Sequence, residues 1–286
     1  MFLKVLGKRK DSYHDILTIF ERISLTDTIK ISKSPKGIVI KSDIPITKNP
    51  KDNLVYKAAK LIFECGKLTS GVKIEIRKRI PIASGLGGGS SDAAAVLRGM
   101  NKLFHLRLSD KALLNMAKEL GADVPFFVLD TAFAVGKGRG DELRVIRSKS
   151  HFWHLIIKAG SKTATKDIYE DFDSEHARMP KRLTLRRGDA RMFSPLKLRM
   201  DYAEAESMLH NDLERAILLK RSVISGISRR LAQLLGKKTI VSGSGPSLFC
   251  LYRTRREAIE ARGTVLRSVN ARSRMGWQIF IAGTQY

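Results

Sequence analysis

The sequence predicts an α+β protein with two domains, and three observations lead to this prediction. The 286 residues fit about two domains of ordinary size. In the first part of the chain, an alternating apolar stretch runs directly into a glycine-rich loop and a helix. After about residue 147 the pattern changes to helices that alternate with the strands of a mostly antiparallel sheet. We therefore expect an N-terminal domain over residues 1–147 and a C-terminal domain over residues 148–286.

Hydrophobic periodicity and capping signals indicate the elements of the first domain. Val72, Ile74 and Ile76 alternate with charged residues, as in a half-buried strand. Ser109 is a suitable N-cap, and Gly121 stands where the following helix would stop. We expect strands at Phe2–Val5, Thr28–Ile31, Ile38–Ile40 and Val72–Ile80, and helices at Asn53–Phe63, Ser91–Phe104 and from Ser109 to near Leu120.

The second domain is expected to form a separate α+β layer. Its apolar runs are short and are interrupted by turn residues, which is typical of strands between helices. We expect strands at Phe152–Lys158, Thr239–Val241, Ser247–Tyr252 and Trp277–Ala282, and helices at Ala203–Leu219, Val223–Leu235 and Arg256–Val269.

Composition excludes some classes of protein and leaves others open. The most apolar stretch, Val124–Val135, falls short of the roughly 20 apolar residues of a membrane span, and no signal peptide is visible. The two cysteines, Cys65 and Cys250, offer neither a metal-ligand spacing nor a disulfide framework. Together these observations lead us to expect a cytoplasmic protein without a membrane partner. The net charge of +25 attracts anions. Its densest cluster, Arg178–Arg191, lacks the aromatic residues that stack on single-stranded bases, so nucleic acid is not expected as the main partner.

The most informative segment is Pro81–Asp92, PIASGLGGGSSD. Its glycines allow the backbone to approach a ligand closely, and the helix that follows offers unpaired N–H groups and a positive dipole end to an anion. No lysine follows Gly89, as a Walker A loop requires, and Ser90 stands where a Rossmann fingerprint needs a third glycine. A flexible hinge is the alternative. The expected phosphate-binding residues are Pro81, Ala83, Ser84, Gly85, Leu86, Gly87, Gly88, Gly89, Ser90 and Ser91.

This segment resembles the second signature motif of the GHMP kinases, the family named for its galactokinase, homoserine, mevalonate and phosphomevalonate members. The resemblance implies a ribosomal protein S5 domain 2-like N-terminal domain, a ferredoxin-like C-terminal domain, and ATP with Mg²⁺ as cofactors. Further segments are similar to those members that phosphorylate the 2-hydroxyl of 4-diphosphocytidyl-2-C-methyl-D-erythritol in the non-mevalonate isoprenoid pathway. These segments are Phe2–His14, Asn53–Ala59, Arg79–Ala95, Gly121–Phe127, Ala134–Leu143, His210–Glu214 and Val241–Phe249.

The resemblance also implies a catalytic residue, Asp123, in a short loop before Pro125. An aspartate with an ordinary pKa of about 3.9 is a weak base. In phosphoryl transfer, however, most catalysis is positioning and charge neutralisation. We therefore expect Asp123 to orient the acceptor hydroxyl and to accept its proton late. An ordinary loop aspartate that caps local N–H groups is the alternative.

The acceptor is expected to be a small molecule with a cytidine diphosphate group. The resemblance places its cytosine at Tyr13 and His14, in a turn after Lys8–Asp11, with Tyr169 as a second aromatic residue. An aromatic ring can stack on a pyrimidine. Half-buried packing is the alternative for both tyrosines, and it has more weight for Tyr169, whose match to the family is weaker. The glycine turn at Gly243 and Ser244 resembles the third motif of the family and is expected to close over the phosphates, with a plain β-turn as the alternative.

One motif of the family is not found. Its first signature contains a Pro-Ala-Lys-Ile/Leu-Asn run ahead of the segment that matches Phe2, and the sequence begins at Met1. We expect either an upstream start, which we favour, or an impaired enzyme. The alternative functions are another GHMP kinase of the homoserine or mevalonate type and an impaired, basic nucleic-acid-binding homologue. A monomer or a homodimer is consistent with the sequence.

Overall fold

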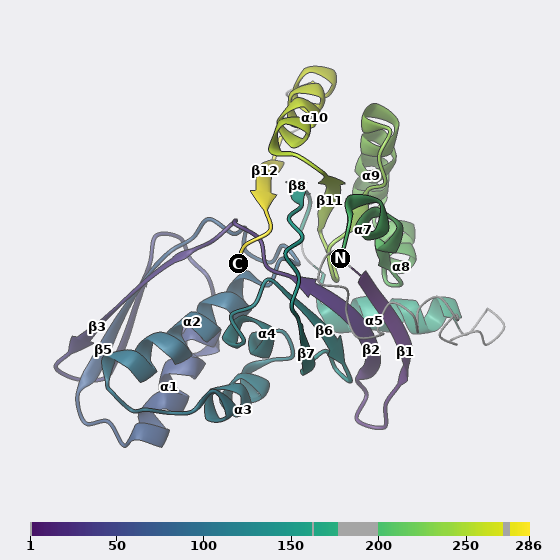
Figure 1. Cartoon of the computed structure of the whole chain (residues 1–286). Coiled ribbons are helices and arrows are strands. Elements are labelled where there is room, and N and C mark those ends of the chain that lie inside the picture. The colour runs from purple at the N-terminus through teal and green to yellow at the C-terminus, as the bar shows by residue number, and fades with distance from the viewer. Residues whose placement is uncertain (1, 162, 177–199, 271–274) are drawn as a thin grey trace. The chain divides into compact units, whose positions relative to one another are not determined.

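The computed structural model describes residues 2–161, 163–176, 200–270 and 275–286 (Figure 1). The chain divides into two compact units. Unit 1 comprises Met1–Leu25, Ala83–Leu86 and Ala132–Tyr286, and unit 2 comprises Thr26–Ile82 and Gly87–Thr131. None of the described helices is long and apolar enough to cross a membrane.

Unit 2 is a three-stranded sheet covered by helices. The central strand β5 pairs antiparallel with β3 and parallel with β4. The alternation predicted for β5 is present, because Val72, Ile74 and Ile76 are buried and pack with the apolar faces of the helices. The elements are β3 (Thr28–Ser34), β4 (Ile38–Ser42), a 3₁₀ turn η1 (Pro50–Asp52), α1 (Leu54–Gly66), β5 (Gly71–Arg77), α2 (Gly88–Leu103), α3 (Asp110–Leu120) and α4 (Val124–Val128).

Unit 1 contains a five-stranded sheet in the order β7-β6-β2-β1-β9 and a four-stranded sheet in the order β10-β11-β8-β12. The four-stranded sheet is antiparallel throughout, as predicted. The elements are β1 (Phe2–Lys8), β2 (His14–Glu21), β6 (Phe133–Lys137), β7 (Glu142–Ile146), β8 (Trp153–Lys158), α5 (Thr165–His176), α7 (Tyr202–Met208), β9 (His210–Asn211), α8 (Glu214–Lys220), α9 (Ser222–Leu235), β10 (Ile240–Val241), β11 (Ser247–Tyr252), α10 (Arg255–Ser268) and β12 (Gln278–Gly283).

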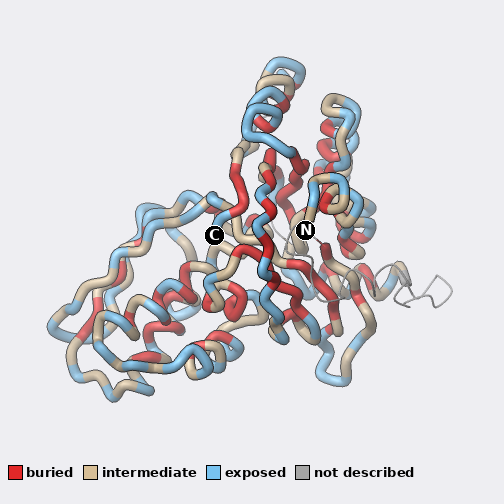
Figure 2. The backbone as a smooth tube through the Cα atoms, in the orientation of Figure 1, coloured by how far each residue is buried: buried red, intermediate tan, exposed pale blue. Residues whose placement is uncertain are grey.

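Buried positions follow one face of the helices in each unit (Figure 2). In α1 the buried residues Val55, Ala58, Ala59 and Ile62 recur at helical spacing and belong to the core of unit 2. In α9 of unit 1, Ile224, Ile227 and Leu231 do the same. Each unit therefore has its own hydrophobic core.

The two compact units do not follow the boundary expected at residue 147. The hairpin β1–β2 pairs with β6 and β9, so the first 25 residues group with the second half of the chain. A division into domains at residue 147 stays a prediction. The basic cluster Arg178–Arg191 lies outside the described residues.

Predicted and observed bounds differ for several elements, among them the helix at Ala203–Leu219, α2 and β5. The single helix expected at Ala203–Leu219 is wrong: it is broken into α7 and α8 because His210 and Asn211 pair with β1. Helix α2 begins at Gly88, before the predicted Ser91, and β5 ends at Arg77, before Ile80.

Candidate active site

The end of the phosphate loop is built into the start of α2, in unit 2. Gly87 is the N-cap residue, with a left-handed φ of 70°. A Cβ atom at Gly87 would lie 2.9 Å from the Phe127 ring, so both the backbone conformation and the space require glycine. The Ser91 N–H donates to the Gly87 carbonyl oxygen at 2.9 Å. The N–H groups of the preceding turn have no partner within the helix, and they can therefore bind an anion.

The middle of the loop, Ala83–Leu86, belongs to unit 1 and is held by the turn between β10 and β11. The Ser247 N–H donates to the Ser84 carbonyl oxygen at 3.1 Å, and Ser242 Oγ donates to the Gly85 carbonyl oxygen at 2.9 Å. A Cβ atom on Gly85, which has a φ of 76°, would lie only 2.5 Å from the Ser242 carbonyl oxygen. The structure therefore brings the predicted loop residues Ser84 and Gly85 to the predicted glycine turn.

The segment His210–Glu214, HNDLE, holds this glycine turn in place. The side-chain amide of Asn211 donates to the carbonyl oxygens of Val241 and Gly243, both at 2.8 Å. Glu214 Oε1 accepts from the Val241 N–H at 3.0 Å, and burial raises the pKa of Glu214. The HNDLE segment thus holds the turn through hydrogen bonds between its side chains and the backbone of the turn.

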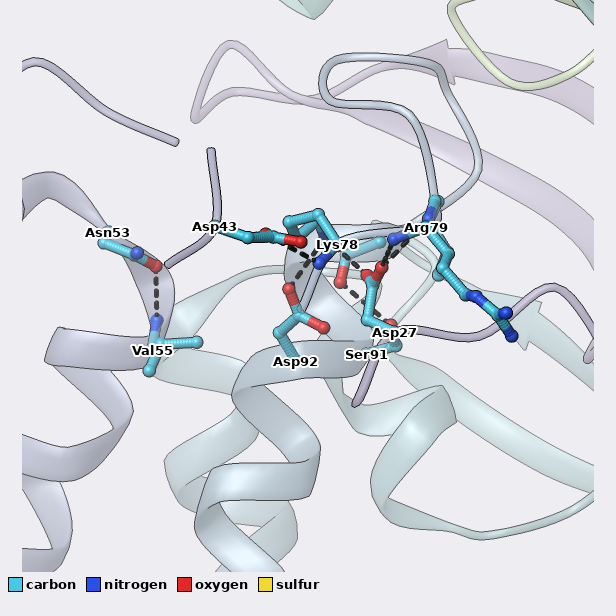
Figure 3. A network of polar contacts seen from close by, with 10 residues as sticks. Asp27, Asp43, Asn53, Val55, Lys78, Arg79, Ser91 and Asp92 are labelled. Carbon is cyan, nitrogen blue, oxygen red and sulfur yellow. Dashed lines mark hydrogen bonds and ion pairs between the residues drawn. The ribbon is translucent and has the colours of Figure 1, made fainter. Parts of the chain in front are cut away.

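A buried charge cluster supports the two ends of the loop within unit 2 (Figure 3). Asp27 Oδ1 accepts from the backbone N–H groups of Arg79 at 2.5 Å and Ile80 at 2.9 Å. The Lys78 ammonium donates to Asp27 Oδ2 and, at 2.8 Å, to Asp92 Oδ2. Because Asp92 lies on α2, this cluster connects the segment before the loop, Lys78–Ile80, to the helix that follows the loop.

The cluster carries one more negative charge than positive charge when both carboxyl groups are ionised. The side chains of Asp27, Lys78 and Asp92 are all at most 5% exposed, so this excess is poorly solvated. Burial and the neighbouring charge of Asp27 raise the pKa of Asp92 to about 6, although Lys78 lowers it. Burial lowers the pKa of Lys78, but its hydrogen bonds to the two carboxylates outweigh burial and hold that pKa above its ordinary value.

Asp123 lies between α3 and α4, as predicted, and is the residue that precedes the first turn of α4. Its φ of −86° and ψ of −19° are helical, and its side chain makes no capping hydrogen bond to α4. The next three residues, Val124–Phe126, are buried. Asp123 is thus fixed by a short, well-packed helix of unit 2, whereas the predicted acceptor residues Tyr13, His14 and Tyr169 belong to unit 1.

The hairpin β1–β2 presents Tyr13 and His14 side by side in sequence but in different environments. Tyr13 lies in the turn, is 56% exposed, and has the Arg139 guanidinium 5.3 Å from its ring centroid. The sequence had suggested that His14 is part of the turn, but it is the first residue of β2, where it pairs with Lys8 and is buried. His14 Nε2 lies 2.7 Å from Asp173 Oδ1.

Helix α5 contacts both the hairpin and the glycine turn, all within unit 1. Its first residue, Thr165, has its hydroxyl 3.0 Å from that of Ser244. One turn later, the Tyr169 ring stacks on the His14 ring with a centroid distance of 4.7 Å and an interplanar angle of 22°. The weak sequence match at Tyr169 therefore corresponds to a direct contact with His14.

Several polar residues of these clusters did not emerge from the sequence as site residues. Asp27 and Asp173 lie far along the chain from their partners, and no motif marks either of them. Asp92 was visible as the end of the loop segment, and only its burial beside Lys78 gives it a part in the cluster. In the described part of the chain, no group of three or more His, Cys, Asp or Glu side chains could hold a metal ion.

Comparison with known proteins agrees with this geometry. Residues 53–131 match the GHMP kinases N terminal domain. The 4-diphosphocytidyl-2-C-methyl-D-erythritol kinase of Acetivibrio thermocellus is 35% identical over 261 residues, which is 90% of this chain and 88% of the relative. The chain belongs to this kinase family, within the GHMP kinases.

Solved structures give the same result for the fold. A crystal structure of 4-(cytidine 5'-diphospho)-2C-methyl-D-erythritol kinase superimposes with a TM-score of 0.78 at 26% identity, covering 100% of this chain and 96% of that one. Homoserine kinase from Cytophaga hutchinsonii superimposes with a TM-score of 0.69 over 93% of this chain and 88% of that one, and its 20% identity shows the fold alone. The predicted fold class and family are confirmed. As a GHMP kinase, the chain is an ATP-dependent small-molecule kinase.

Proposed function

We propose that this chain transfers the γ-phosphate of ATP to the 2-hydroxyl, a tertiary alcohol, of 4-diphosphocytidyl-2-C-methyl-D-erythritol. The observation that carries the proposal is the 35% identity to the Acetivibrio thermocellus kinase over 90% of the chain. Two features of the structure support it. The phosphate loop offers N–H groups to a polyphosphate, and the hairpin with α5 offers aromatic rings to a pyrimidine.

The phosphates of ATP are assigned to the loop and the start of α2. A Cβ atom on Gly89 would have its nearest neighbour at 3.8 Å, so the backbone there is open to a close approach. Mg²⁺, when bound with ATP, neutralises charge on the β- and γ-phosphates. The phosphates together with a loop serine hydroxyl would hold that ion.

Asp123 is assigned to the acceptor hydroxyl. Phosphoryl transfer passes through a loose transition state, so the hydroxyl keeps its proton until late and needs orientation more than deprotonation. A carboxylate held at the start of a short buried helix is suited to this, because it can accept a hydrogen bond from the hydroxyl in a fixed direction. Asp123 then takes the proton as the new P–O bond forms and the bond between the γ-phosphorus and the bridging oxygen breaks, which releases ADP.

The nucleobase end of the acceptor is assigned to Tyr13, His14 and Tyr169. Tyr13 is exposed and available for stacking, and the Tyr169 and His14 rings are already stacked on each other. Gly243 and Ser244 are assigned to the phosphates, because their turn holds the carbonyl oxygens of Ser84 and Gly85 through its flanking residues.

The experiment is a phosphoryl transfer assay with ATP and 4-diphosphocytidyl-2-C-methyl-D-erythritol, using the wild type, Asp123→Asn and the matched control Asp130→Asn. The two aspartates flank opposite ends of α4, and the Asp130 side chain is 58% exposed. We expect Asp123→Asn to lower kcat by about 10²- to 10⁴-fold, the range for a lost acid–base group. Asp130→Asn should remain close to the wild type.

Each outcome separates one part of the proposal from the others. Wild-type turnover of homoserine or mevalonate, without turnover of the cytidine compound, would contradict the substrate. A rate in Asp123→Asn equal to that of Asp130→Asn would contradict the role of Asp123 and leave the substrate standing.

The remaining expectations belong to the same proposal. We expect a cytoplasmic monomer or homodimer that does not use nucleic acid as its partner. Binding to nucleic acid through phosphate contacts weakens steeply with salt because counterions are released. Nucleic-acid binding that persists at physiological salt, together with no kinase activity, would favour the nucleic-acid-binding alternative.

A further inference from the structure

Asp173 joins the two strands of the acceptor hairpin to α5. Its Oδ2 accepts from the Lys8 ammonium at 2.7 Å, and its Oδ1 lies 2.7 Å from His14 Nε2. Lys8 is the last residue of β1 and His14 is the first of β2, and the two are paired in register. A single carboxylate therefore receives one donor from each strand, on either side of the turn that carries Tyr13.

The contact to His14 fixes the orientation of its ring. The His14 side chain is 5% exposed, and its ring stacks on Tyr169 and meets Phe172 edge-on at 6.5 Å. A carboxylate partner keeps the proton on Nε2 and sets the plane of the imidazole. Burial would raise the pKa of Asp173, but the hydrogen bonds from Lys8 and His14 outweigh it and hold that pKa below its ordinary value.

Helix α5 does not depend on Asp173 for its attachment to unit 1. Ile168 and Phe172 are buried on one face of α5, in the same core cluster as Leu213 and Ile217. Tyr169 and Asp173, four residues apart, share a different face. Loss of the Asp173 carboxylate should therefore leave α5 in place and disturb only the contacts to the hairpin.

We infer that Asp173 is a positioning residue for the nucleobase end of the acceptor. It holds the His14 ring stacked on Tyr169, and it connects α5 to the hairpin that carries Tyr13. This inference rests on the proposed function for the identity of the acceptor. Asp173 acts through His14 and is not assigned a contact with the substrate. Its loss should weaken acceptor binding without changing the handling of ATP.

Asp173→Asn tests the carboxylate alone, because asparagine has nearly the same size as aspartate. The two oxygens of the carboxylate take one donor each. An amide has one oxygen and no charge, so it can accept from Lys8 only if its NH₂ group faces His14 Nε2, which can then accept only in the other tautomer. The charge-assisted contacts that fix the His14 ring are lost in either orientation of the amide. Asp171→Asn is the matched control: Asp171 is on the same helix and pairs with Lys220 of α8 instead of a hairpin residue.

The experiment compares steady-state kinetics of wild type, Asp173→Asn, Asp173→Glu and Asp171→Asn with 4-diphosphocytidyl-2-C-methyl-D-erythritol. For Asp173→Asn we expect the acceptor KM to rise about tenfold, the effect of one charge-assisted hydrogen bond, with the KM for ATP and kcat within about twofold of the wild type. Asp173→Glu should recover part of the acceptor affinity, and Asp171→Asn should match the wild type.

An acceptor KM in Asp173→Asn equal to that of the wild type would overturn the inference and leave the proposed function standing. Equal increases in both KM values, or a similar increase in Asp171→Asn, would also overturn it, because they would indicate a general effect on the fold. If the wild type shows no turnover, the proposed function fails. Calorimetric titration with cytidine monophosphate then still tests Asp173: weaker binding by Asp173→Asn supports the inference, and equal binding overturns it.

Discussion

Two lysines of this chain donate to aspartates over nearly the same distance in opposite surroundings. Lys78 Nζ lies 2.8 Å from Asp92 Oδ2 in unit 2, and the two side chains are 4% and 5% exposed. Lys8 Nζ lies 2.7 Å from Asp173 Oδ2 in unit 1, and those side chains are 55% and 28% exposed. Distance alone would rank the two contacts as equal.

Burial separates them. When one partner of a buried ion pair is removed, the other is left as an uncompensated charge, whereas an exposed pair loses little because water replaces the partner. Lys78 therefore supports the fold around the phosphate loop, and Lys8 contributes at most to orientation at the acceptor end. A charged contact near the candidate site therefore supports stability in one region and the orientation of side chains in the other.

The largest effect that tests this comparison is expected for Lys78→Met. The substitution keeps the length of the side chain but leaves Asp27 and Asp92 without their shared cation. We expect the free energy of unfolding to fall by about 3–5 kcal/mol, as for other broken buried pairs. Urea denaturation followed by circular dichroism measures it.

Lys8→Met is the control for that experiment, because it removes a lysine with the same kind of partner from an exposed position. Its urea midpoint should coincide with that of the wild type. Similar losses of stability in the two variants would contradict the claim that burial separates the two lysines. A Lys78→Met variant as stable as the wild type would contradict it as well.

A smaller effect, with a defined pH dependence, is expected for Asp92→Asn. Below about pH 3.8 the Asp92 carboxyl is protonated in both the folded and the unfolded chain. As the pH rises, the unfolded chain releases this proton first, and the native state keeps it until about pH 6. The contribution of Asp92 to the free energy of unfolding is therefore fully present below pH 3.8 and is lost as the pH rises through 6.

Asparagine removes this titration. The stability of Asp92→Asn relative to the wild type should increase between pH 4 and pH 7, by up to about 3 kcal/mol at roughly 1.4 kcal/mol per pKa unit. Denaturation curves at a series of pH values measure it. A stability difference that stays constant over this range, or that moves against the variant as the pH rises, would contradict the raised pKa of Asp92.

The sequence predicted those elements whose local signals agree with their packing. The strand expected at Ser247–Tyr252 is present with these bounds, because its residues are apolar, aromatic or small and all are buried. Ser109 caps α3 as expected, with its hydroxyl accepting from the Ala112 N–H. The phosphate loop was also visible, because its glycines and the helix after it are contiguous in sequence.

Elements that depend on distant contacts were not predictable. Ala203–Leu219 looks like one helix, but pairing of His210 and Asn211 with β1 interrupts it. The supporting charges of the site have the same origin: Asp27 is 51 residues from Lys78, and Asp173 is 159 residues from His14. Gly88 was assigned to the loop as part of the glycine-rich run, yet it begins α2, where a Cβ atom would lie 2.8 Å from the Ile80 side chain.

The smallest effects on stability are expected for two glycines of the phosphate loop. One of them is closely surrounded by other atoms and the other is not, so they extend the comparison of buried and exposed positions. Gly85 has a φ of 76°, and an added Cβ atom would lie 2.5 Å from the Ser242 carbonyl oxygen. Gly85→Ala should therefore lower the free energy of unfolding by about 1–3 kcal/mol. The displaced loop should also raise the KM for ATP by at least about tenfold.

Gly89→Ala makes the same chemical change where the protein itself offers space. The nearest atom to the added methyl group is Leu54 Cδ1, at 3.8 Å, and Gly89 lies in the first turn of α2. Stability should be unchanged or higher by up to about 1 kcal/mol, because alanine favours the helix. The KM for ATP should nevertheless rise if the phosphates approach the backbone at this point, because the methyl group then takes their place.

Thermal denaturation and ATP kinetics on both variants separate a loss of stability from a loss of space for the phosphates. An unchanged KM in Gly89→Ala would move the phosphates away from the first turn of α2, and a stable Gly85→Ala would show that the loop and the β10–β11 turn are less tightly packed than their distances indicate.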